Sequence, residues 1–577
     1  MLEKICPTCN EKTQEDIPVE IYWCDNCNVP IIRSANDTNK HCCTLCKGKV
    51  YYLTVDLRPV FPEERLLMEI IKNIEPFQHE KDAVWAATGN KYYINGLKNK
   101  KYFISAKDMK FADIDYIIKK LNENKDRINY SYFNKNIDNF IKANKDRLDY
   151  LKNEAYNFIN EAREGYADQQ IMVSFSGGKD STVVSSLALR ALGIPQIIHV
   201  FGDTTLEFPL TKEYVERFRK NNRQTIFRTA VNADQDFYEV CEDIGPPSRV
   251  MRWCCTMFKT GPITRTIAST FKRYSSILTF YGVRKFESAS RSKFERITKN
   301  NEHAKIQKQI VASPIFFWKD IDLWLYMLAE KIDFNDAYRL GYDRVGCWCC
   351  PNNSERSLFL SKIYMSEEAK KWREYLIRFA KSIGKPDAEQ YIDDGKWKAR
   401  QGGYGVDAAK DVKINYNDCT TDENAKIYKL NKEMDDNFYN MFLPFGIVSK
   451  ELGKKLIGEV LVLHQKTNIP IISIQPYYGS EYVHAVKIQT LNVNKHKDIK
   501  NHDDLQRMIS YQIRKYNACR KCLRCESICK FGAIKITNNS YIIDKEKCKK
   551  CKMCVTAKYL DGGCMMYKYL FVSSNRA

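Results

Sequence analysis

The residues with the clearest chemical role lie in the run from Ile171 to Thr182. Its apolar start predicts a buried strand over 171–175, followed by a Gly-Gly turn and the start of a helix. The glycines let the backbone approach a ligand closely, the helix N-terminus offers unpaired N–H groups, and Lys179 adds a cation. Ser176 and Ser181 add hydroxyl donors. We therefore predict a phosphate-binding loop, although the spacing differs from that of a Walker A loop.

The chain holds 22 cysteines, most of them in Cys-x2-Cys pairs. In a long intracellular protein such pairs indicate metal sites rather than disulfides. The N-terminal group favours a structural zinc site on two pairs, because two such pairs supply four tetrahedral ligands. The favoured ligands are Cys24, Cys27, Cys43 and Cys46. A further pair, Cys6 and Cys9, could take part in a different pairing, or in a second site with His41 or Cys42.

The C-terminal cysteines have the spacing of bacterial two-cluster ferredoxins, in which the fourth cysteine of each motif ligates the other cluster. This rule predicts one [4Fe–4S] cluster on Cys519, Cys522, Cys525 and Cys564. It predicts a second on Cys548, Cys551, Cys554 and Cys529. Lys530 replaces the usual proline, and Cys564 lies farther along the chain than expected. Zinc binding at these cysteines is the alternative. If they bind iron–sulfur clusters, the chain contains its own electron-transfer module.

A central group can bind a third cluster, because adjacent Cys254 and Cys255 and the pair Cys347 and Cys350 complete four ligands. It is similar to the Cys-Cys…Cys-x2-Cys site of assimilatory sulfonucleotide reductases and of their relatives in DNA phosphorothioation. Cys349 is left over, either as a buried bystander or as a sulfur-handling thiol.

The loop resembles the Ser-Gly-Gly-x-Asp-Ser motif of the ATP-pyrophosphatase and adenine nucleotide alpha-hydrolase families. The resemblance implies that an adenine nucleotide, ATP or phosphoadenosine phosphosulfate, binds at these residues. They are Ser176, Gly177, Gly178, Lys179, Asp180 and Ser181. It further implies that Asp180 supports the loop or Mg²⁺, and that Asp203, after a second strand at 197–201, lies near the nucleotide.

A later segment resembles the family's Gly-x-Arg-x2-Glu-Ser-x2-Arg pattern, which faces the phosphate or sulfate of the substrate. The matching residues are Gly282, Arg284, Glu287, Ser288 and Arg291. Arginine suits this role because its guanidinium binds two oxygens at once. The resemblance covers about residues 166–360 and identifies this part as similar to phosphoadenosine phosphosulfate reductases. We expect Lys179, Asp180, Asp203, Arg284 and Arg291 to take part in catalysis.

One departure from the reductases decides between reactions. The reductases carry a Glu-Cys-Gly-x-His tail whose thiol attacks the sulfonucleotide, and this sequence contains no such motif. The resemblance therefore favours an enzyme that adenylates an acceptor and transfers sulfur to nucleic acid, as in tRNA thiolation or DNA phosphorothioation. A sulfonucleotide reductase that uses its own ferredoxin domain is the alternative. A non-catalytic, nucleotide-sensing iron–sulfur scaffold is a third.

Composition bounds the partners. A formal net charge of +21 over 577 residues favours an anionic partner such as tRNA or DNA. Electron-donor and sulfur-donor proteins are further expected partners. No apolar run is long enough for a membrane span, and the N-terminus has no apolar signal segment, so we expect a cytoplasmic protein.

Alternating strands and helices predict an α/β fold, with a doubly wound parallel sheet that binds its ligand at the carboxyl ends of the strands. The expected domains are a zinc ribbon (1–56), a small α/β domain (57–110), a helical bridge (111–165), the nucleotide domain (166–400), a small mixed domain (425–510) and a ferredoxin domain (511–570). A helix over 503–516 should lead into the last of these, which should contain a short hairpin at 531–544.

Overall fold

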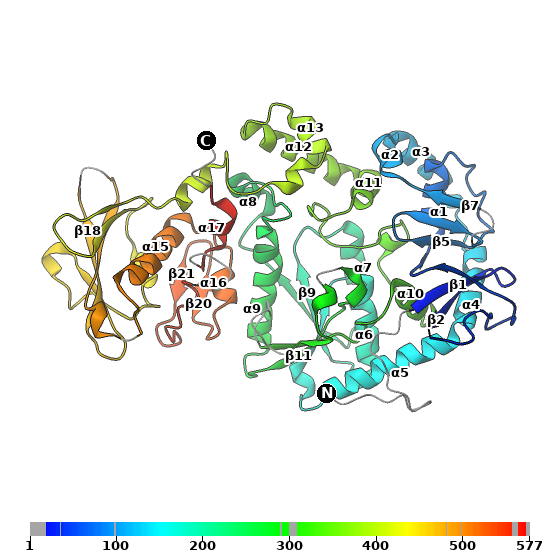
Figure 1. The fold of residues 1–577 in the computed structure, drawn as a ribbon, viewed down its shortest axis with the longest axis horizontal. Helices are drawn as coiled ribbons and strands as arrows, with labels where there is room; N and C mark the ends of the chain where they lie inside the picture. The colour runs from blue at the N-terminus through cyan, green and yellow to red at the C-terminus, as the bar shows by residue number, and fades with distance from the viewer. Residues whose placement is uncertain are drawn as a thin grey trace.

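The computed structural model describes residues 19–34, 36–96, 100–288, 291–298, 308–479, 482–496, 498–556 and 563–572. The nucleotide domain lies in the middle, between two small N-terminal sheets on the right and an antiparallel sheet on the left (Figure 1). No helix among these residues is long and apolar enough to cross a membrane.

The central sheet has the strand order β10–β9–β8–β11–β13–β12. Its parallel strands are β8 (Ile171–Phe175), β9 (Ile198–Asp203), β10 (Ile226–Val231), β11 (Ile277–Phe280) and β13 (Gln309–Ala312), and the short edge strand β12 (Ile297–Thr298) is antiparallel. The direction in which strands are added reverses between β8 and β11. In open α/β sheets, ligands bind at such a reversal, outside the carboxyl ends of the strands.

Helices cover both faces of this sheet. They include α6 (Lys179–Leu192), α7 (Pro209–Asn221), α9 (Gly261–Thr270) and α10 (Asp320–Ala329). Helix α8 (Phe237–Ile244) instead packs with α12 (Ser366–Ser382). Side chains alternate along β8, so that Phe175 stacks on Phe218 of α7 at a centroid distance of 4.3 Å. Met172 of the same strand points to the opposite face of the sheet and packs in a cluster with Ile267 of α9. The predicted doubly wound α/β core is therefore present.

The N-terminal part forms two small antiparallel sheets. One contains β1 (Val19–Cys24), β2 (Val29–Ser34) and β3 (Tyr51–Thr54); the other contains β4 (Arg58–Pro59), β5 (Val84–Ala87), β6 (Lys91–Ile94) and β7 (Lys100–Phe103), with α1 (Pro62–Ile71), α2 (Ala106–Lys110) and α3 (Ile114–Asn124) nearby. Helices α4 (Ser131–Ala143) and α5 (Lys145–Ala162) join these sheets to the nucleotide domain. Asn144, between the two helices, accepts a hydrogen bond from the backbone N–H of Ile32 at 2.7 Å.

Beyond the nucleotide domain, α11 (Glu355–Tyr364), α12 (Ser366–Ser382) and α13 (Ala388–Asp393) precede a six-stranded antiparallel sheet. Its strands are β14 (Tyr416–Asp418), β15 (Ala425–Lys429), β16 (Ile447–Ser449), β17 (Val460–Leu463), β18 (Pro470–Tyr477) and β19 (Ala485–Thr490), with α14 (Asp436–Asn440) between β15 and β16. Helix α15 (His502–Ala518) then leads to α16 (Arg524–Ser527), the hairpin β20 (Ile534–Ile536) and β21 (Tyr541–Ile543), and α17 (Met565–Leu570). This last module lies against the nucleotide domain, where Arg265 of α9 pairs with Glu526 at 2.5 Å.

Candidate nucleotide site and cysteine centres

The loop between β8 and α6 is held by its own serines. The Ser181 hydroxyl accepts a hydrogen bond from the Ser176 N–H at 3.1 Å and donates to the carbonyl of Gly178 at 2.9 Å. Gly177 has φ +71°, and a Cβ there would lie 2.9 Å from the Thr211 side chain. A side chain at this position would therefore be both strained and crowded, which explains why the turn needs glycine.

Lys179, the first residue of α6, points into the protein. Its ammonium donates to the backbone carbonyl of Asp343 at 2.7 Å and lies 3.3 Å from the Asp320 carboxylate. Its backbone N–H donates to the Tyr338 hydroxyl at 2.9 Å, so one helix N-terminal donor already has an acceptor. Burial disfavours the charged ammonium, but the carboxylates of Asp320 and Asp180 hold the pKa of Lys179 above its ordinary value. Lys179 is therefore a buried cation with a carboxylate partner.

Arg284 completes this cluster of charges from the other side of the strand reversal. Its guanidinium contacts Asp180 at 2.5 Å and Asp320 at 3.1 Å. The backbone just before it passes close to α6, since a Cβ on Gly282 would lie 2.9 Å from the backbone nitrogen of Ser181. Glycine therefore lets the segment that follows β11 lie directly against the loop.

Two residues that the sequence analysis missed reach this site from the N-terminal sheets. The Asp56 carboxylate accepts the backbone N–H groups of Asp320 and Ile321, each at 3.1 Å, and so caps α10. Burial and the negative charge of Asp320 raise the pKa of Asp56 to about 6. Arg58 donates to the carboxylate of Asp343 at 2.7 Å. No local pattern distinguishes either residue in the sequence.

The remaining residues of the family pattern bond to one another. Arg291 forms an ion pair with Glu287, and the Ser288 hydroxyl accepts from the Arg291 N–H at 3.3 Å. Asp203, at the carboxyl end of β9, accepts the N–H of Thr205 at 2.8 Å. Because β9 is adjacent to β8, Asp203 lies at the same edge of the sheet as the phosphate loop. Arg291 also interacts electrostatically with Asp180 of the loop.

The central cysteines come together at this edge of the sheet. Cys254 hydrogen-bonds Cys255 and interacts electrostatically with Cys347, while Cys350 interacts with Cys255. The hydrogen bond from Cys254 and the positive charge of Arg252, 3.6 Å from the Cys255 sulfur, lower the pKa of Cys255 to about 5. Electrostatic interactions therefore connect the four cysteines of the predicted central site, and Cys255 favours the thiolate form that binds metal.

One segment, residues 338–350, joins the phosphate loop to these cysteines. It supplies the hydroxyl and the carbonyl that hold Lys179 and then packs Val345 over the loop, 3.5 Å from the position of a Cβ on Gly178. Two residues later is Cys347, whose sulfur lies 3.3 Å from the Thr204 hydroxyl. Two residues of chain span at most about 7 Å. The cysteine group is therefore adjacent to the phosphate loop.

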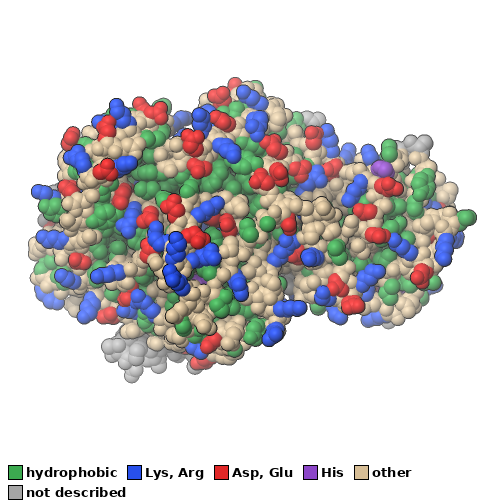
Figure 2. Space-filling view, turned by 180° about the vertical axis from the view of Figure 1, so that it is seen from behind, with side chains coloured by type: hydrophobic (Ala, Val, Ile, Leu, Met, Phe, Trp, Pro, Cys, Tyr) green, Lys and Arg blue, Asp and Glu red, His purple; other side chains and the backbone are tan. Residues whose placement is uncertain are grey.

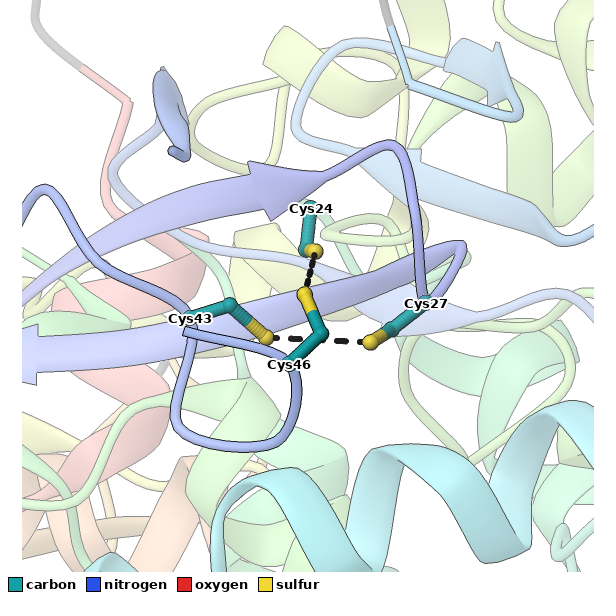
Figure 3. Close-up of side chains that lie close together, drawn as sticks. All are labelled: Cys24, Cys27, Cys43 and Cys46. Atoms are coloured by element: carbon teal, nitrogen blue, oxygen red, sulfur yellow. Dashed lines mark hydrogen bonds between the residues drawn. The ribbon is translucent and has the colours of Figure 1, made fainter. Parts of the chain in front are cut away.

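The N-terminal cysteines form a compact tetrad (Figure 3). The sulfurs of Cys24 and Cys46 are 3.5 Å apart, those of Cys27 and Cys43 are 3.8 Å apart, and all four lie within 4.8 Å of one another. Tetrahedral Zn–S bonds of about 2.3 Å place sulfurs about 3.8 Å apart. A hydrogen bond from the Gly48 backbone lowers the pKa of Cys46 to about 6. The tetrad can therefore bind a metal ion, and its spacing fits zinc.

His41 and Cys42 are not among the four cysteines of this tetrad. Cys6 and Cys9 lie outside the described residues. Cys42 is exposed, and the His41 ring packs edge-on against Tyr22 at a centroid distance of 5.6 Å.

The eight C-terminal cysteines line two cavities. One is lined by Cys529, Cys548, Cys551 and Cys554, and the other by Cys519, Cys522, Cys525 and Cys564. These are the same two sets of four that the ferredoxin spacing predicts. Replacement of proline by Lys530 has therefore not separated Cys529 from the other triplet.

Backbone conformation explains how the triplets and the distant Cys564 converge. Lys521 and Lys550 occupy the same position in the two Cys-x2-Cys-x2-Cys loops, and both are left-handed, with φ of 52° and 55°. Such conformations cost non-glycine residues about 1 kcal/mol or more and persist where the surrounding structure holds them in place. Gly563 has φ +65°, and a Cβ there would lie 2.5 Å from the Cys554 carbonyl. Glycine at 563 therefore lets the chain pass against the backbone of the second triplet just before Cys564, which lines the cavity of the first triplet.

The fold and the site together define an α/β nucleotide-binding domain with cysteine centres beside its phosphate loop. Residues 170–353 match the family model of the phosphoadenosine phosphosulfate reductase domain. The match covers the loop, the Arg284 segment and all four central cysteines. Together, the fold and this match support binding of an adenine nucleotide.

Curated relatives extend the comparison. An uncharacterized protein of Methanocaldococcus jannaschii is 33% identical over 291 residues, which are 50% of this chain and 58% of that protein. A second protein of that organism is 31% identical, and the chain covers 57% of it, so this chain spans less than two thirds of either relative. The adenosine 5'-phosphosulfate reductase of Staphylococcus epidermidis is 25% identical over 198 residues, covering 34% of this chain and 76% of that enzyme.

Two further matches differ in kind. Sulfate adenylyltransferase subunit 2 of Brucella anthropi is 26% identical over 220 residues, covering 34% of this chain and 68% of that protein. The crystal structure of phosphoadenylyl-sulfate reductase from Candida auris is 16% identical, with a TM-score of 0.27, and covers 35% of this chain and 95% of that one. The relatives matched in sequence therefore include both an adenosine 5'-phosphosulfate reductase and a sulfate adenylyltransferase subunit.

Proposed function

We propose that this protein is an iron–sulfur enzyme that binds an adenine nucleotide, adenylates an acceptor and transfers sulfur to nucleic acid, as in tRNA thiolation or DNA phosphorothioation. The observation that carries the proposal is the segment 338–350. It contacts the phosphate loop through Tyr338, Asp343 and Val345 and then supplies Cys347 to the central cysteine group. Nucleotide chemistry and sulfur chemistry can therefore share one site.

The side chains at the loop suit transfer of an adenylyl group. The N–H groups at the start of α6, with the hydroxyls of Ser176 and Ser181, would hold phosphates. Lys179 and Arg284 would neutralise the charge that develops on the leaving pyrophosphate. Asp180 supplies a carboxylate of the kind that holds Mg²⁺ beside phosphates. Lys179 and Arg284 pair with the carboxylates of Asp180 and Asp320, so nucleotide phosphates would compete with these carboxylates for cations that are already in place.

The cysteine groups fit the metals that the proposal needs. The eight C-terminal cysteines would hold two [4Fe–4S] clusters, the central Cys254, Cys255, Cys347 and Cys350 a third, and the N-terminal tetrad zinc. Iron–sulfur clusters supply one-electron chemistry when bound. The chain itself contributes the thiolates, the left-handed loops that aim them and the close packing of the C-terminal module on the nucleotide domain.

Nucleic acid is the proposed acceptor because of charge. The chain carries +21 overall, and neutralisation of phosphates by lysine and arginine provides most non-specific binding. On the face shown in Figure 2, however, basic side chains are interspersed with acidic ones. Binding to tRNA or duplex DNA that weakens steeply with salt would support this acceptor, whereas no binding at low salt would exclude it.

The second candidate function is reduction of a sulfonucleotide with electrons from the C-terminal module. Its support is the similarity to adenosine 5'-phosphosulfate reductases, one of which is covered over 76% of its length.

One experiment separates the two. Anaerobically purified protein is tested for pyrophosphate release from ATP, with and without tRNA or DNA, and for sulfite release from phosphoadenosine and adenosine phosphosulfate. Pyrophosphate release stimulated by one polymer supports the proposal, and sulfite release without ATP turnover supports the reductase. Neither product, with intact iron and nucleotide binding, would favour a non-catalytic scaffold.

A matched pair of variants tests the site itself. Lys179→Ala should lower either turnover about 100- to 1000-fold, the usual effect of removing one preorganised charge-stabilising donor, with iron and zinc contents unchanged. Lys370→Ala removes an exposed lysine on α12 and should leave turnover unchanged. Equal turnover in the two variants would show that the loop is not the reaction site.

A further inference from the structure

A single lysine lies between the two C-terminal cysteine cavities. Lys515, in the last turn of α15, is only 1% exposed. It lines the cavity of Cys519, Cys522, Cys525 and Cys564. Its ammonium also donates to the backbone carbonyl of Cys554 at 2.6 Å, and Cys554 lines the other cavity. One positive charge is therefore buried in the wall that separates the two cavities.

This buried charge has no carboxylate partner within the described ranges, where no ion pair to Lys515 is found. Lys179 provides the contrast, because it is equally buried, at 3% exposure, but pairs with Asp320. The acidic groups that interact electrostatically with Lys515 are thiols on both sides of the wall, including Cys525 and Cys554. Burying an unpaired ammonium is costly. An apolar side chain would fill the same space at less cost, so the charge calls for an anion in the cavities.

We propose that Lys515 is the counter-charge shared by the two iron–sulfur clusters of the C-terminal module, and that it raises the reduction potential of both. The proposal rests on the ligation of the eight cysteines stated under Proposed function. A cluster ligated by four thiolates is anionic, and one-electron reduction makes it more negative. A fixed cation in a low-dielectric wall therefore stabilises the reduced form more than the oxidised form. Net charge and hydrogen bonding are established determinants of cluster potential.

The geometry assigns Lys515 an electrostatic as well as a positioning role. Its hydrogen bond to the Cys554 carbonyl helps to place that ligand, and any purely structural role would end there. A charge effect instead extends to the cluster on the other side of the wall, whose cysteines Lys515 also faces. The effect on both potentials is therefore the property that distinguishes the two roles.

The test compares Lys515→Met, which keeps the length but removes the charge, with Lys515→Arg, which keeps the charge. Each is made in the full-length chain, purified anaerobically, and analysed for iron and sulfide and by redox titration followed by electron paramagnetic resonance. Lys515→Met should lower both potentials, so that the reduced-to-oxidised ratio at the parent's midpoint potential falls about tenfold, which is about 59 mV for one electron. Lys515→Arg should recover most of this shift.

Lys547→Met is the control, since it removes a 61% exposed lysine of the same module that pairs with Asp544. It should leave both potentials unchanged. Intact iron with unchanged potentials in Lys515→Met, or a shift confined to the Cys554 cluster, overturns the proposal. If Lys515→Met loses iron, retention in Lys515→Arg supports a need for the charge, and loss in both variants overturns it. No nucleotide or nucleic acid is present, so the result is independent of whether the protein adenylates an acceptor.

Discussion

The hydroxyl of Tyr338 occupies a position at which a nucleotide phosphate is expected. It accepts the backbone N–H of Lys179 at 2.9 Å, in a buried hydrogen bond at the start of α6. Helix N-terminal N–H groups are the donors that bind phosphates. We therefore predict that Tyr338→Phe strengthens nucleotide binding, because the free protein no longer has an internal acceptor that the phosphate must displace.

The magnitude follows from the single hydrogen bond that is lost. The ring remains, so its packing on Trp324, at a centroid distance of 5.8 Å, is kept. A net hydrogen bond contributes about 1 kcal/mol, and an unsatisfied buried N–H costs about 1–3 kcal/mol. Without nucleotide the variant should be less stable by about that amount. With nucleotide, a phosphate oxygen satisfies the N–H, so a gain of about 1 kcal/mol corresponds to roughly fivefold tighter binding.

Equilibrium binding of ATP and Mg²⁺ to the parent and the variant, by titration calorimetry, measures this directly. Tyr326→Phe is the matched control, because it removes the hydroxyl of a fully buried tyrosine that contacts Ser186 at 3.1 Å, away from the loop. The control should lose stability without a change in ATP affinity. Weaker or equal ATP binding by Tyr338→Phe would refute the reasoning and show that the hydroxyl assists the nucleotide or does not meet it.

Three further predictions concern charge and metal. The pKa of Asp56 is raised from 3.8 to about 6, so the folded protein binds a proton at this carboxylate more tightly than the unfolded chain does. The free energy of unfolding should therefore fall by up to about 3 kcal/mol as pH rises from 4 to 7. If the parent and Asp56→Asn showed the same pH dependence of unfolding, this prediction would be contradicted. Cys46→Ser should remove zinc measured by elemental analysis, whereas Cys42→Ser, outside the tetrad, should retain it. Cys255→Ser should lose about a third of the iron, and the buried Cys241→Ser should lose none; equal iron in the two variants would exclude a central cluster.

Local sequence signals predicted several individual strands and helices, both at the loop and in the C-terminal module. The expected strand at 171–175 coincides with β8, and the expected helix at 503–516 is α15, His502–Ala518. The expected hairpin at 531–544 contains β20 and β21. These succeeded because apolar runs, the Gly-Gly turn and the Cys-x2-Cys spacing act over a few residues.

Contacts between distant segments could not be predicted in the same way. Tyr338 and Asp343 meet the phosphate loop from about 160 residues further along the chain. Asp56 reaches the N-terminus of α10 across more than 260 residues. Nothing in the composition around these residues sets them apart, because their roles depend on how the sheets pack. The domain boundaries, the metals and the catalytic roles remain predictions.

Asp56 and Arg58, which precede the nucleotide domain in the chain, contact its site. The nucleotide domain therefore depends on the N-terminal part of the protein. The segment that matches the reductase family, 170–353, contains the phosphate loop and the central cysteines but neither of these residues. Excised alone, it would lose the carboxylate that caps α10 and the guanidinium that holds Asp343. We therefore expect that a change at Asp56 or Arg58 alters nucleotide affinity without touching the loop. The segment 170–353 is thus not an independent unit, and its activity should be measured only in the intact chain.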